Sequence, residues 1–352
     1  MDHILITGGA GFVGANLAIY LKQRFPRVKI SVLDNLIRRG SELNIPRLQD
    51  ATIDFIRGDV RNREELLQLP AMDVIIDAAA EPSVLSGIKD GPQMLVDINF
   101  QGTLNCLELA RKYKSDFIYL STNRVYSYPL LNSLSFTENT TRFEYASGTP
   151  YFQKGIDENF DTSGLKSFYG ASKLASESFI REYAHHYDFN AIINRCGVIA
   201  GPWQMGKVDQ GFVALWVIAH YFGKSLQYLG YGGQGKQVRD VLHVDDLCKL
   251  ISSQLSNDFP GECKTYNVGG TWTNSISLLE LTGITENITG RKLDIGADEE
   301  TRVVDMRIYY TDASKVQNDY QWQAEKTVEE CVADTFNWIN KNEKSLVKIF
   351  KH

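Results

Sequence analysis

The chain of 352 residues is poor in the features that mark several specialised classes of protein. Its five cysteines are scattered and form no Cys-x-x-Cys pair, which argues against a disulfide framework or a zinc site and favours reduced thiols. No apolar run is long enough to span a membrane, and no basic, apolar leader precedes the strand-like run at residues 3–7, so we expect no signal peptide. We therefore predict a cytoplasmic protein without a metal site.

An excess of charge of one sign is also lacking. The formal net charge is −6 and the isoelectric point is about 5.6, so we expect no general binding to nucleic acid or to a membrane surface. Hydrophobic residues make up 43% and charged residues 23%, which is typical of a globular protein with a large buried core. This length favours one large domain with a smaller lobe.

In the first half of the chain, short apolar runs alternate with longer amphipathic ones. Because the short runs are apolar on both faces, they predict an α/β fold: a Rossmann-type, doubly wound parallel sheet with helices on both sides. The predicted strands are Ile4–Thr7, Ile30–Leu33, Ile53–Arg57, Val74–Ala78, Phe117–Leu120 and Ala191–Asn194. The predicted helices include Val13–Arg24, Met94–Tyr113 and Tyr169–Tyr187.

This alternation breaks at Leu130–Leu165, a segment rich in Asn, Ser, Thr, Gly and aromatic residues that predicts a long irregular excursion. After about residue 197, Gly-rich turns separate short strands and helices. We therefore predict a Rossmann domain at residues 1–196, with the excursion at 130–165 as its long loop. A smaller, discontinuous C-terminal lobe is predicted at 197–352, with some segments returning to the first domain.

A glycine-rich run at residues 8–14 directly follows the first predicted strand and opens the first helix. Glycine lets the backbone approach a pyrophosphate, and the helix N-terminus offers free N–H groups and a positive dipole end. A tight turn without a ligand is the alternative. The context favours a dinucleotide, because Asp34 ends the second strand, where an acidic side chain holds the adenosine ribose, and Asp59 and Val60 follow the third strand on the adenine side.

The charge of Asp34 also bears on the choice of dinucleotide. A carboxylate at this position would repel a ribose 2′-phosphate, so the sequence predicts NAD rather than NADP. Arg38 and Arg39 lie close in sequence and could bind such a phosphate. A solvated basic turn is the interpretation that we favour for them.

Tyr169 and Lys173 lie four residues apart on one face of a predicted helix. A free tyrosine has a pKa of about 10, but a nearby ammonium and a positive nicotinamide ring would lower it. Tyr169 could then take the proton of a substrate hydroxyl while the adjoining carbon gives hydride to NAD, and Lys173 would also bind the nicotinamide ribose. An amphipathic surface pair is the alternative.

Thr122 follows the fifth predicted strand, within the run Ser121–Tyr126. In doubly wound folds the carboxyl ends of the strands face the ligand crevice, and a hydroxyl there can stabilise charge on a reacting oxygen. The alternative is an ordinary Ser/Thr turn at the end of a strand.

Together these motifs resemble the extended short-chain dehydrogenase/reductases that act on nucleotide sugars, over nearly the whole chain. The resemblance implies a nucleotide-sugar substrate, Thr122 as the hydroxyl, Tyr169 as the base and Lys173 as its partner, with Ser121 in support. It also implies a homodimer formed through the helices Met94–Tyr113 and Tyr169–Tyr187. The predicted cofactor contacts are Gly8, Gly11, Phe12, Val13, Gly14, Asp34, Asn35, Asp59, Val60, Ala78, Ala80, Asn99, Tyr169 and Lys173, with Asn99 near the segment that positions Lys173.

The residues after Thr122 narrow the reaction. Dehydratases and decarboxylases of this family carry acids there, whereas this chain has Asn123 and Arg124, so the resemblance implies epimerisation, which needs no such acid. Segments 121–126, 155–158, 209–211 and 235–243 are similar to those of epimerases that oxidise C2 of a CDP-hexose in bacterial surface-polysaccharide synthesis. The predicted substrate contacts are Thr122, Asn123, Gln237, Arg239 and Arg302.

Several alternatives stay open. Arg239 and Arg302, predicted to bind the diphosphate, could instead form surface ion pairs with Asp240, Asp245 or Glu300. A UDP-sugar 4-epimerase and a dehydrogenase with net redox change are the rival activities, and the complete catalytic set argues against a non-catalytic NAD sensor. The chain departs from the family pattern at Glu81, Ser127 and Phe168, which leaves the identity of the sugar open.

Overall fold

The computed structural model describes residues 1–206, 210–257 and 261–350. Two compact units are present. Unit 1 comprises residues 1–125, 167–196 and 248–266, and unit 2 comprises residues 126–166, 197–247 and 267–352. Asp209, part of the predicted motif at 209–211, lies outside the described residues.

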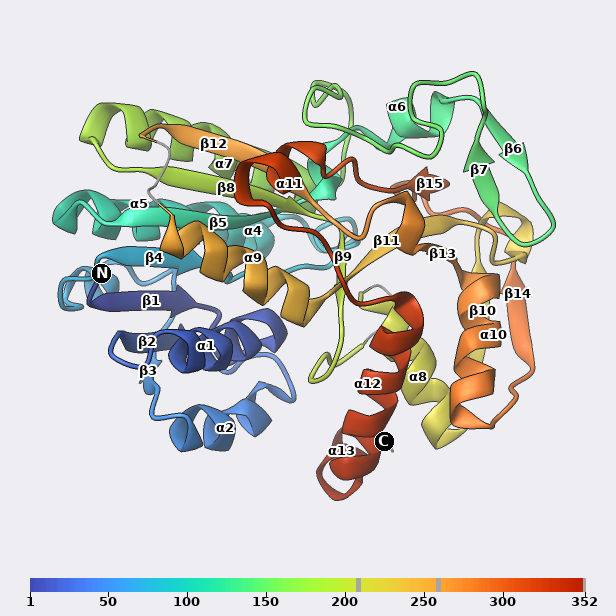
Figure 1. The fold of residues 1–352 in the computed structure, drawn as a ribbon, viewed down its shortest axis with the longest axis horizontal. Helices are drawn as coiled ribbons and strands as arrows, with labels where there is room; N and C mark the ends of the chain where they lie inside the picture. The colour runs from blue at the N-terminus through green and yellow to red at the C-terminus, as the bar shows by residue number, and fades with distance from the viewer. Residues whose placement is uncertain (207–209, 258–260, 351–352) are drawn as a thin grey trace. The chain divides into compact units, whose positions relative to one another are not determined.

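Unit 1 is built on a seven-stranded sheet with the strand order β12-β8-β5-β4-β1-β2-β3 (Figure 1). Neighbouring strands from β3 to β8 pair in parallel. The strands are β1 (His3–Thr7), β2 (Lys29–Asp34), β3 (Asp54–Arg57), β4 (Val74–Asp77), β5 (Asp116–Thr122), β8 (Ala191–Cys196) and β12 (Cys263–Val268). The helices are α1 (Phe12–Arg24), α2 (Asn44–Asp50), α3 (Arg63–Leu67), α4 (Gln93–Val96), α5 (Gly102–Tyr113), α7 (Phe168–Tyr187) and α9 (Val244–Ser256), which begins in unit 2.

The central strands form because their residues are apolar on both faces. All residues of β1 and all of β8 are buried, so helices must cover both sides of the sheet. One core cluster joins Leu5, Ile75 and Phe117 of the strands to Leu107 of α5 and Ile180 of α7. The α/β fold with a parallel sheet is thus confirmed, and each predicted strand lies within a few residues of an observed one.

The predicted helix Met94–Tyr113 is not uniform. It is α4, a π-helical turn η2 (Asp97–Gln101) and α5 in immediate succession. Such a turn inserts one residue into the helical repeat and is frequent at functional sites. Here it contains Asn99, which is fully buried.

The described residues of unit 2 form three small sheets. β11 (Val238–His243) pairs with β13 (Ser275–Ser277), β15 (Ile308–Tyr309) and β9 (Val198–Ala200), while β10 (Leu226–Leu229) pairs with β14 (Ile295–Asp298) and β6 (Phe136–Glu138) with β7 (Phe143–Tyr145). The helices are α6 (Tyr128–Ser133), α8 (Phe212–Phe222), α10 (Leu278–Thr289), α11 (Ser314–Tyr320), α12 (Val328–Lys341) and α13 (Glu343–Phe350). Among the described residues, no helix is both long and apolar enough to cross a membrane.

The excursion at 130–165, expected as a loop of the first domain, belongs to unit 2 and contains α6, β6 and β7. Asn267 explains this attachment. Its backbone N–H donates to Glu158 Oε1 at 2.6 Å, its side-chain amide donates to the Ile156 carbonyl at 2.9 Å, and it accepts the Tyr126 hydroxyl at 2.7 Å. The segment 155–158, similar to that of CDP-hexose epimerases, therefore anchors this excursion within unit 2.

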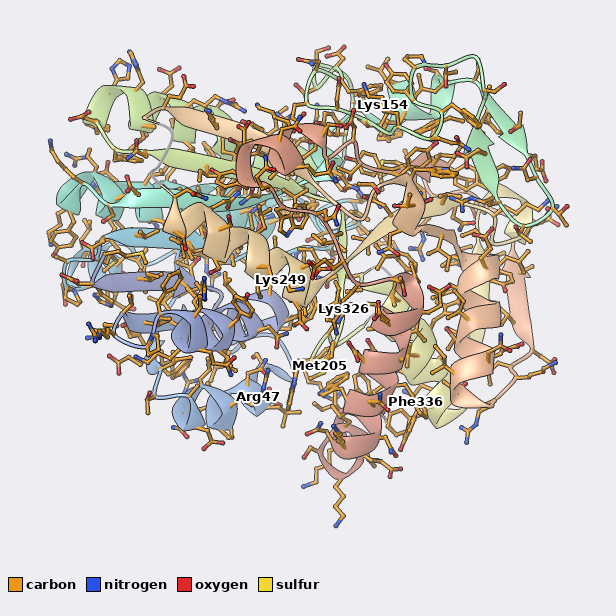
Figure 2. All side chains as sticks on the ribbon, in the orientation of Figure 1. Arg47, Lys154, Met205, Lys249, Lys326 and Phe336 are labelled. Carbon is orange, nitrogen blue, oxygen red and sulfur yellow. The ribbon has the colours of Figure 1, made fainter. Side chains whose placement is uncertain are left out.

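The start of α12 is fixed to the start of α9. The Asp246 carboxylate accepts the backbone N–H groups of Glu325 and Lys326 at 3.0 and 2.9 Å. The Lys326 ammonium forms an ion pair with Asp334 of α12, and Lys326 is labelled in Figure 2. A capping box of Thr327 and Glu330 then satisfies the first free N–H groups of the helix.

Two glycines provide a test of the packing of the dinucleotide-type turn. An added Cβ on Gly14 would lie 2.3 Å from the Gly8 carbonyl oxygen, whereas a Cβ on Gly283 of α10 would meet nothing within 4 Å. We predict that Gly14→Ala lowers the free energy of unfolding by about 1–3 kcal/mol through overpacking. Gly283→Ala should raise it by about 0.5–1 kcal/mol through helix propensity.

Urea unfolding, followed by circular dichroism and by intrinsic fluorescence, measures both variants. A Gly14→Ala protein as stable as wild type would contradict the close packing of α1 against the turn.

Candidate active site

The turn between β1 and α1 has the shape that a pyrophosphate needs. Gly8 has φ of +61°, and an added Cβ would lie 2.8 Å from the carbonyl oxygen of Ala78. Gly11 is the N-cap of α1, and no side chain caps the free N–H groups of the first turn. These N–H groups and the helix dipole are therefore available to an anion. Phe12 and Val13, in that first turn, are half-buried.

Two residues of α2 hydrogen-bond to this turn and to α1, and the sequence did not predict them. The buried Asn44 donates to the carbonyl of Ala10 at 2.8 Å. Arg47, labelled in Figure 2, donates to Asn44 at 2.6 Å and to Asn16 of α1 at 2.8 Å. Burial lowers the pKa of Arg47 to about 10. These contacts join positions some thirty residues apart, so no local pattern announces them.

Asp34 ends β2, beside the turn. Its carboxylate accepts the backbone N–H groups of Ala10 at 3.1 Å and of Leu36 at 2.8 Å. Each oxygen keeps a second lone pair for a ribose hydroxyl. Burial raises the pKa of Asp34, and the charge of Asp59 raises it further.

Asp59 and Asn35 lie next to each other after β3 and β2. The Asn35 amide donates to Asp59 at 2.8 Å, and Arg61 binds the same carboxylate with two N–H groups, at 2.9 and 2.7 Å. The hydrogen bonds of Arg61 hold the pKa of Asp59 well below its usual range. Val60 is buried, and its carbonyl accepts the Asn105 amide at 2.8 Å.

The strand β4 delivers Ala78 and Ala80 to the same end of the sheet, and both are half-buried. Small side chains here leave the Gly8 backbone close to the strand. The structure therefore brings the predicted cofactor residues of β1, β2, β3 and β4 to the carboxyl ends of neighbouring strands, where open α/β sheets bind their ligands.

Tyr169 lies in the first turn of α7, which begins there because Ser167 caps it by accepting the Gly170 N–H at 3.1 Å. Thr122, at the end of β5, is buried and hydrogen-bonds the Tyr169 hydroxyl. The Thr122 oxygen also accepts the backbone N–H of Arg124 at 3.2 Å. The hydroxyl and the phenol are thus adjacent, as a proton transfer to and from one substrate oxygen requires.

The expected lowering of the Tyr169 pKa by Lys173 is wrong for these side chains. Burial raises the pKa of Tyr169 to about 12, against the effect of the Thr122 hydrogen bond. The positive charge that acts to lower it is that of Arg124, whereas the charge of Glu81 raises it. The Lys173 ammonium lies over the ring of Tyr119 instead.

Lys173 is buried, with 1% of its surface exposed, and its ammonium lies 4.0 Å from the ring centre of Tyr119. Burial lowers its pKa to about 8. Among the residues that the structure describes, no group accepts a hydrogen bond from this ammonium. An ammonium without a protein acceptor can donate to a bound ribose, so the side chain suits the contact predicted for it.

Asn99, in the π-helical turn η2, contacts the helix that carries Tyr169 and Lys173. The Asn99 side-chain amide donates to the Ser172 hydroxyl at 3.3 Å and to the Glu81 backbone carbonyl at 3.0 Å. The Asn99 backbone carbonyl accepts the Ser176 hydroxyl at 3.0 Å. The wider turn thus fixes both α7 and the backbone at Glu81. Asn123, predicted to contact the sugar, is buried, and its side-chain oxygen accepts the Thr122 hydroxyl at 3.4 Å.

A buried charged group one turn beyond Lys173 was also missed. Glu177 is fully buried and binds Arg195 of β8 at 2.7 Å, Arg181 at 3.1 Å and the Ser121 hydroxyl at 2.6 Å. The two arginines neutralise its charge, and Ser121 is thereby held next to Thr122. The Ser121 hydroxyl, predicted to support Thr122, is thus hydrogen-bonded to α7.

The predicted substrate contacts Gln237, Arg239 and Arg302 lie in unit 2. Arg239 is buried and donates to Asp305 at 2.8 Å and to the carbonyls of Val238 and Met306 at 2.7 and 2.5 Å. Its ion-pair partner is therefore Asp305, and three of its N–H groups are engaged within the protein. Gln237 donates to the Leu229 carbonyl at 3.0 Å.

Arg302 differs from Arg239. It is half-buried, and its guanidinium forms no ion pair or hydrogen bond with any described residue. Its backbone carbonyl accepts the N–H of Asp305, so one turn holds both arginines in the same part of unit 2. Within residues 1–206, 210–257 and 261–350, no three His, Cys, Asp or Glu side chains are placed to hold a metal ion.

The chain is similar in sequence to known NAD-dependent enzymes. The sequence model of the NAD dependent epimerase/dehydratase family matches residues 4–269. The CDP-paratose 2-epimerase of Salmonella typhi is 32% identical over 351 residues, which cover 96% of this chain and 99% of that protein.

Two solved structures are similar over almost the whole chain. The dTDP-glucose 4,6-dehydratase of Bacillus anthracis, solved in complex with NAD, is 28% identical, covers 98% of each chain and has a TM-score of 0.72. The UDP-glucose 4-epimerase of Thermotoga maritima, solved with UDP-glucose, has a TM-score of 0.80 at 23% identity and covers 97% of this chain and 99% of its own. The latter shows the shared fold.

The position of Asp34 leads to a prediction about cofactor choice. Asp34→Ala should weaken NAD binding roughly tenfold to a hundredfold, because a carboxylate–hydroxyl hydrogen bond is lost. NADP binding should weaken far less, because the repulsion of a 2′-phosphate is lost as well. Titration calorimetry with each cofactor measures both dissociation constants.

The ratio of the two constants is the informative quantity, because Ala10 and Leu36 also lose their acceptor in this variant. Asp54→Ala, which removes an exposed carboxylate at the opposite end of β3, is the matched control and should leave the ratio unchanged. Equal losses for NAD and NADP in Asp34→Ala would exclude Asp34 as the ribose ligand.

Proposed function

Because the chain belongs to the NAD-dependent epimerase/dehydratase family, we propose that it epimerises a nucleotide sugar at C2 and converts CDP-paratose to CDP-tyvelose. The observation that carries the proposal is the Thr122–Tyr169 pair, followed by Asn123 and Arg124 rather than by acids. The similarity to the Salmonella typhi CDP-paratose 2-epimerase supports the sugar and the base. We place the reaction in the cytoplasm, within surface-polysaccharide synthesis, on the same resemblance.

The residues of unit 1 divide the chemistry among them. Tyr169 accepts the proton of the C2 hydroxyl and returns it at the end of the turnover, and Thr122 holds the same oxygen as charge develops on it. NAD, when bound, would supply the hydride acceptor and donor. Lys173 holds the cofactor ribose, which is why its buried ammonium lacks a protein acceptor.

No external reductant enters this cycle, since the hydride that leaves C2 returns to its other face. The protein must therefore hold the keto sugar while it turns over. The buried Asn123 beside Thr122 and the half-buried Arg302 of unit 2 are the contacts we assign to sugar and diphosphate. Arg302 suits the diphosphate because its planar fork is free to pair with phosphate oxygens.

One observation favours a second activity, 4,6-dehydration. The charge of Glu81 acts on Tyr169, so a carboxylate lies near the reacting atoms in spite of Asn123 and Arg124. Glu81 is held in place by Asn99 at its backbone and accepts the Ser83 N–H at 3.2 Å. An acid so placed could donate the proton that elimination of water needs.

We also propose a homodimer through α5 and α7. Phe179 of α7 is 44% exposed and packs edge-on against Phe100, with ring centres 5.3 Å apart. Met94 of α4, which continues through η2 into α5, is 52% exposed. Sedimentation equilibrium checks this: Phe179→Glu should shift a dimer toward monomer, and a monomeric wild-type protein would exclude it.

The experiment that tests the function is an NMR assay of the purified protein with CDP-paratose and no added NAD. Appearance of CDP-tyvelose is expected and would establish C2 epimerisation with retained cofactor. No conversion by folded, NAD-containing protein would exclude this substrate. Parallel samples with a UDP-hexose and with CDP-glucose then test 4-epimerisation and dehydration.

Tyr169→Phe tests the base. This variant removes only the proton acceptor, so NAD binding should persist while turnover falls about a hundredfold or more. Tyr183→Phe is the matched control, because Tyr183 lies on the same helix but bonds Glu108 at 2.9 Å, away from Thr122. Full turnover in Tyr169→Phe, measured by the same NMR assay, would remove Tyr169 as the base.

A further inference from the structure

The strand β4 ends in a carboxylate that neither the motifs nor the proposed reaction uses. Asp77 is 1% exposed, and each of its oxygens accepts one hydroxyl: Thr7 of β1 at 2.6 Å and Thr103 of α5 at 2.7 Å. Neither donor carries a charge. No lysine or arginine of the described residues forms an ion pair with Asp77.

The register of the sheet places Asp77 beside the ring under Lys173. In the parallel pair β4–β5, Asp77 is the partner of Tyr119. Partner residues of a parallel pair project to the same side of the sheet. Tyr119 is fully buried, and the Lys173 ammonium lies 4.0 Å from its ring centre. Asp77 and Lys173 are therefore both neighbours of Tyr119, one by strand register and the other by contact with its ring.

We propose that Asp77 is a positioning residue for Lys173: its buried carboxylate is the counter-charge that keeps the lysine protonated over Tyr119. This inference rests on the proposed role of Lys173 in holding the cofactor. A π face attracts a cation, and a nearby buried carboxylate adds to that attraction in a medium that water does not screen.

The other groups that face Lys173 do not supply this charge as directly. Cys196 of β8 is buried, and its thiol has a pKa raised to about 12, so it is neutral in the working range. Glu177 lies one turn along α7 and already binds Arg195 and Arg181. Burial lowers the pKa of Lys173, and Asp77 is the largest influence that raises it, ahead of Cys196 and Glu177.

A purely structural role is the competing explanation, because Asp77 also links β1, β4 and α5 through its two threonines. The two explanations differ in what removal of the charge alone does. Asp77→Asn keeps the shape and can still hydrogen-bond both hydroxyls. It therefore leaves the links but takes away the counter-charge.

The test is the titration of Lys173, followed by NMR of protein labelled with ¹³C at lysine Cε. The signal is assigned by its loss in Lys173→Met, and spectra are taken with and without added NAD. Without the negative charge the ammonium is less favoured, so Asp77→Asn should lower the midpoint of Lys173 by about one pH unit. The alkaline limb of the turnover profile should move in the same direction.

Asp116→Asn is the matched control. It removes a half-buried carboxylate from the opposite end of β5, where Asn190 binds it at 2.8 Å. This variant should leave the Lys173 midpoint unchanged. An unchanged midpoint in Asp77→Asn, with or without a loss of thermal stability, would overturn the proposal and leave Asp77 a structural residue.

A second measurement keeps the test decisive if Asp77→Asn does not fold. Coupling between two sites is reciprocal, so Lys173→Met should raise the midpoint of Asp77, observed through ¹³C-labelled aspartate carboxyls, by the same amount. No change at Asp77 would overturn the proposal. A shifted Lys173 midpoint in a protein that turns over no nucleotide sugar would support Asp77 and refute the proposed function, so the two failures are distinguishable.

Discussion

A buried ammonium is the group to which much of unit 1 is adapted. The pKa of Lys173 is about 8 because burial outweighs the charges that raise it, of which Asp77 is the largest. A nearby π face and a nearby carboxylate favour the charged form against that burial. The ring of Tyr119 comes from β5 and the carboxylate of Asp77 from β4. The hydroxyls that hold Asp77 come from β1 and α5. The order of the strands therefore determines which charges lie near Lys173, since a different order would separate the Tyr119 ring, the Asp77 carboxylate and the hydroxyls that bind it.

The same burial acts on Tyr169 in the opposite sense, because it raises the pKa of the phenol to about 12. Desolvation thus favours the neutral form of both side chains, and the phenolate with the ammonium is costly in the protein alone. A nearby positive charge lowers that cost, and Arg124 supplies part of it. In the proposed reaction, proton transfer to Tyr169 is therefore expected to depend on the positive charge that a bound cofactor would add.

The sequence could predict the parts of this site that depend on local patterns. The strands follow from short apolar runs, and the turn at residues 8–14 from the spacing of its glycines. Contacts between distant positions could not be predicted: Asn99 reaches Ser172 across 73 residues, and Asn44 reaches Ala10 across 34. The direction of the Tyr169 pKa was wrong because helical spacing does not say where a long lysine side chain ends. The excursion at 130–165 was expected as a loop of the first domain, whereas its contacts group it with unit 2, since Asn267, which anchors it, lies over 100 residues away.

The two arginines of unit 2 show why a shared redox core does not define a substrate. From the sequence they are equivalent candidates for the diphosphate, but Arg239 has three N–H groups engaged with Val238, Asp305 and Met306, whereas Arg302 has no protein partner among the described residues. Arg239 therefore shapes the turn that carries Arg302, and Arg302 is the group with free donors. In the proposed reaction, Thr122 and Tyr169 act on one oxygen of whatever sugar is bound. Which sugar and which base are accepted depends on side chains such as Arg302, which keep free donors. The positions of these side chains follow from packing within unit 2 rather than from the motifs of unit 1.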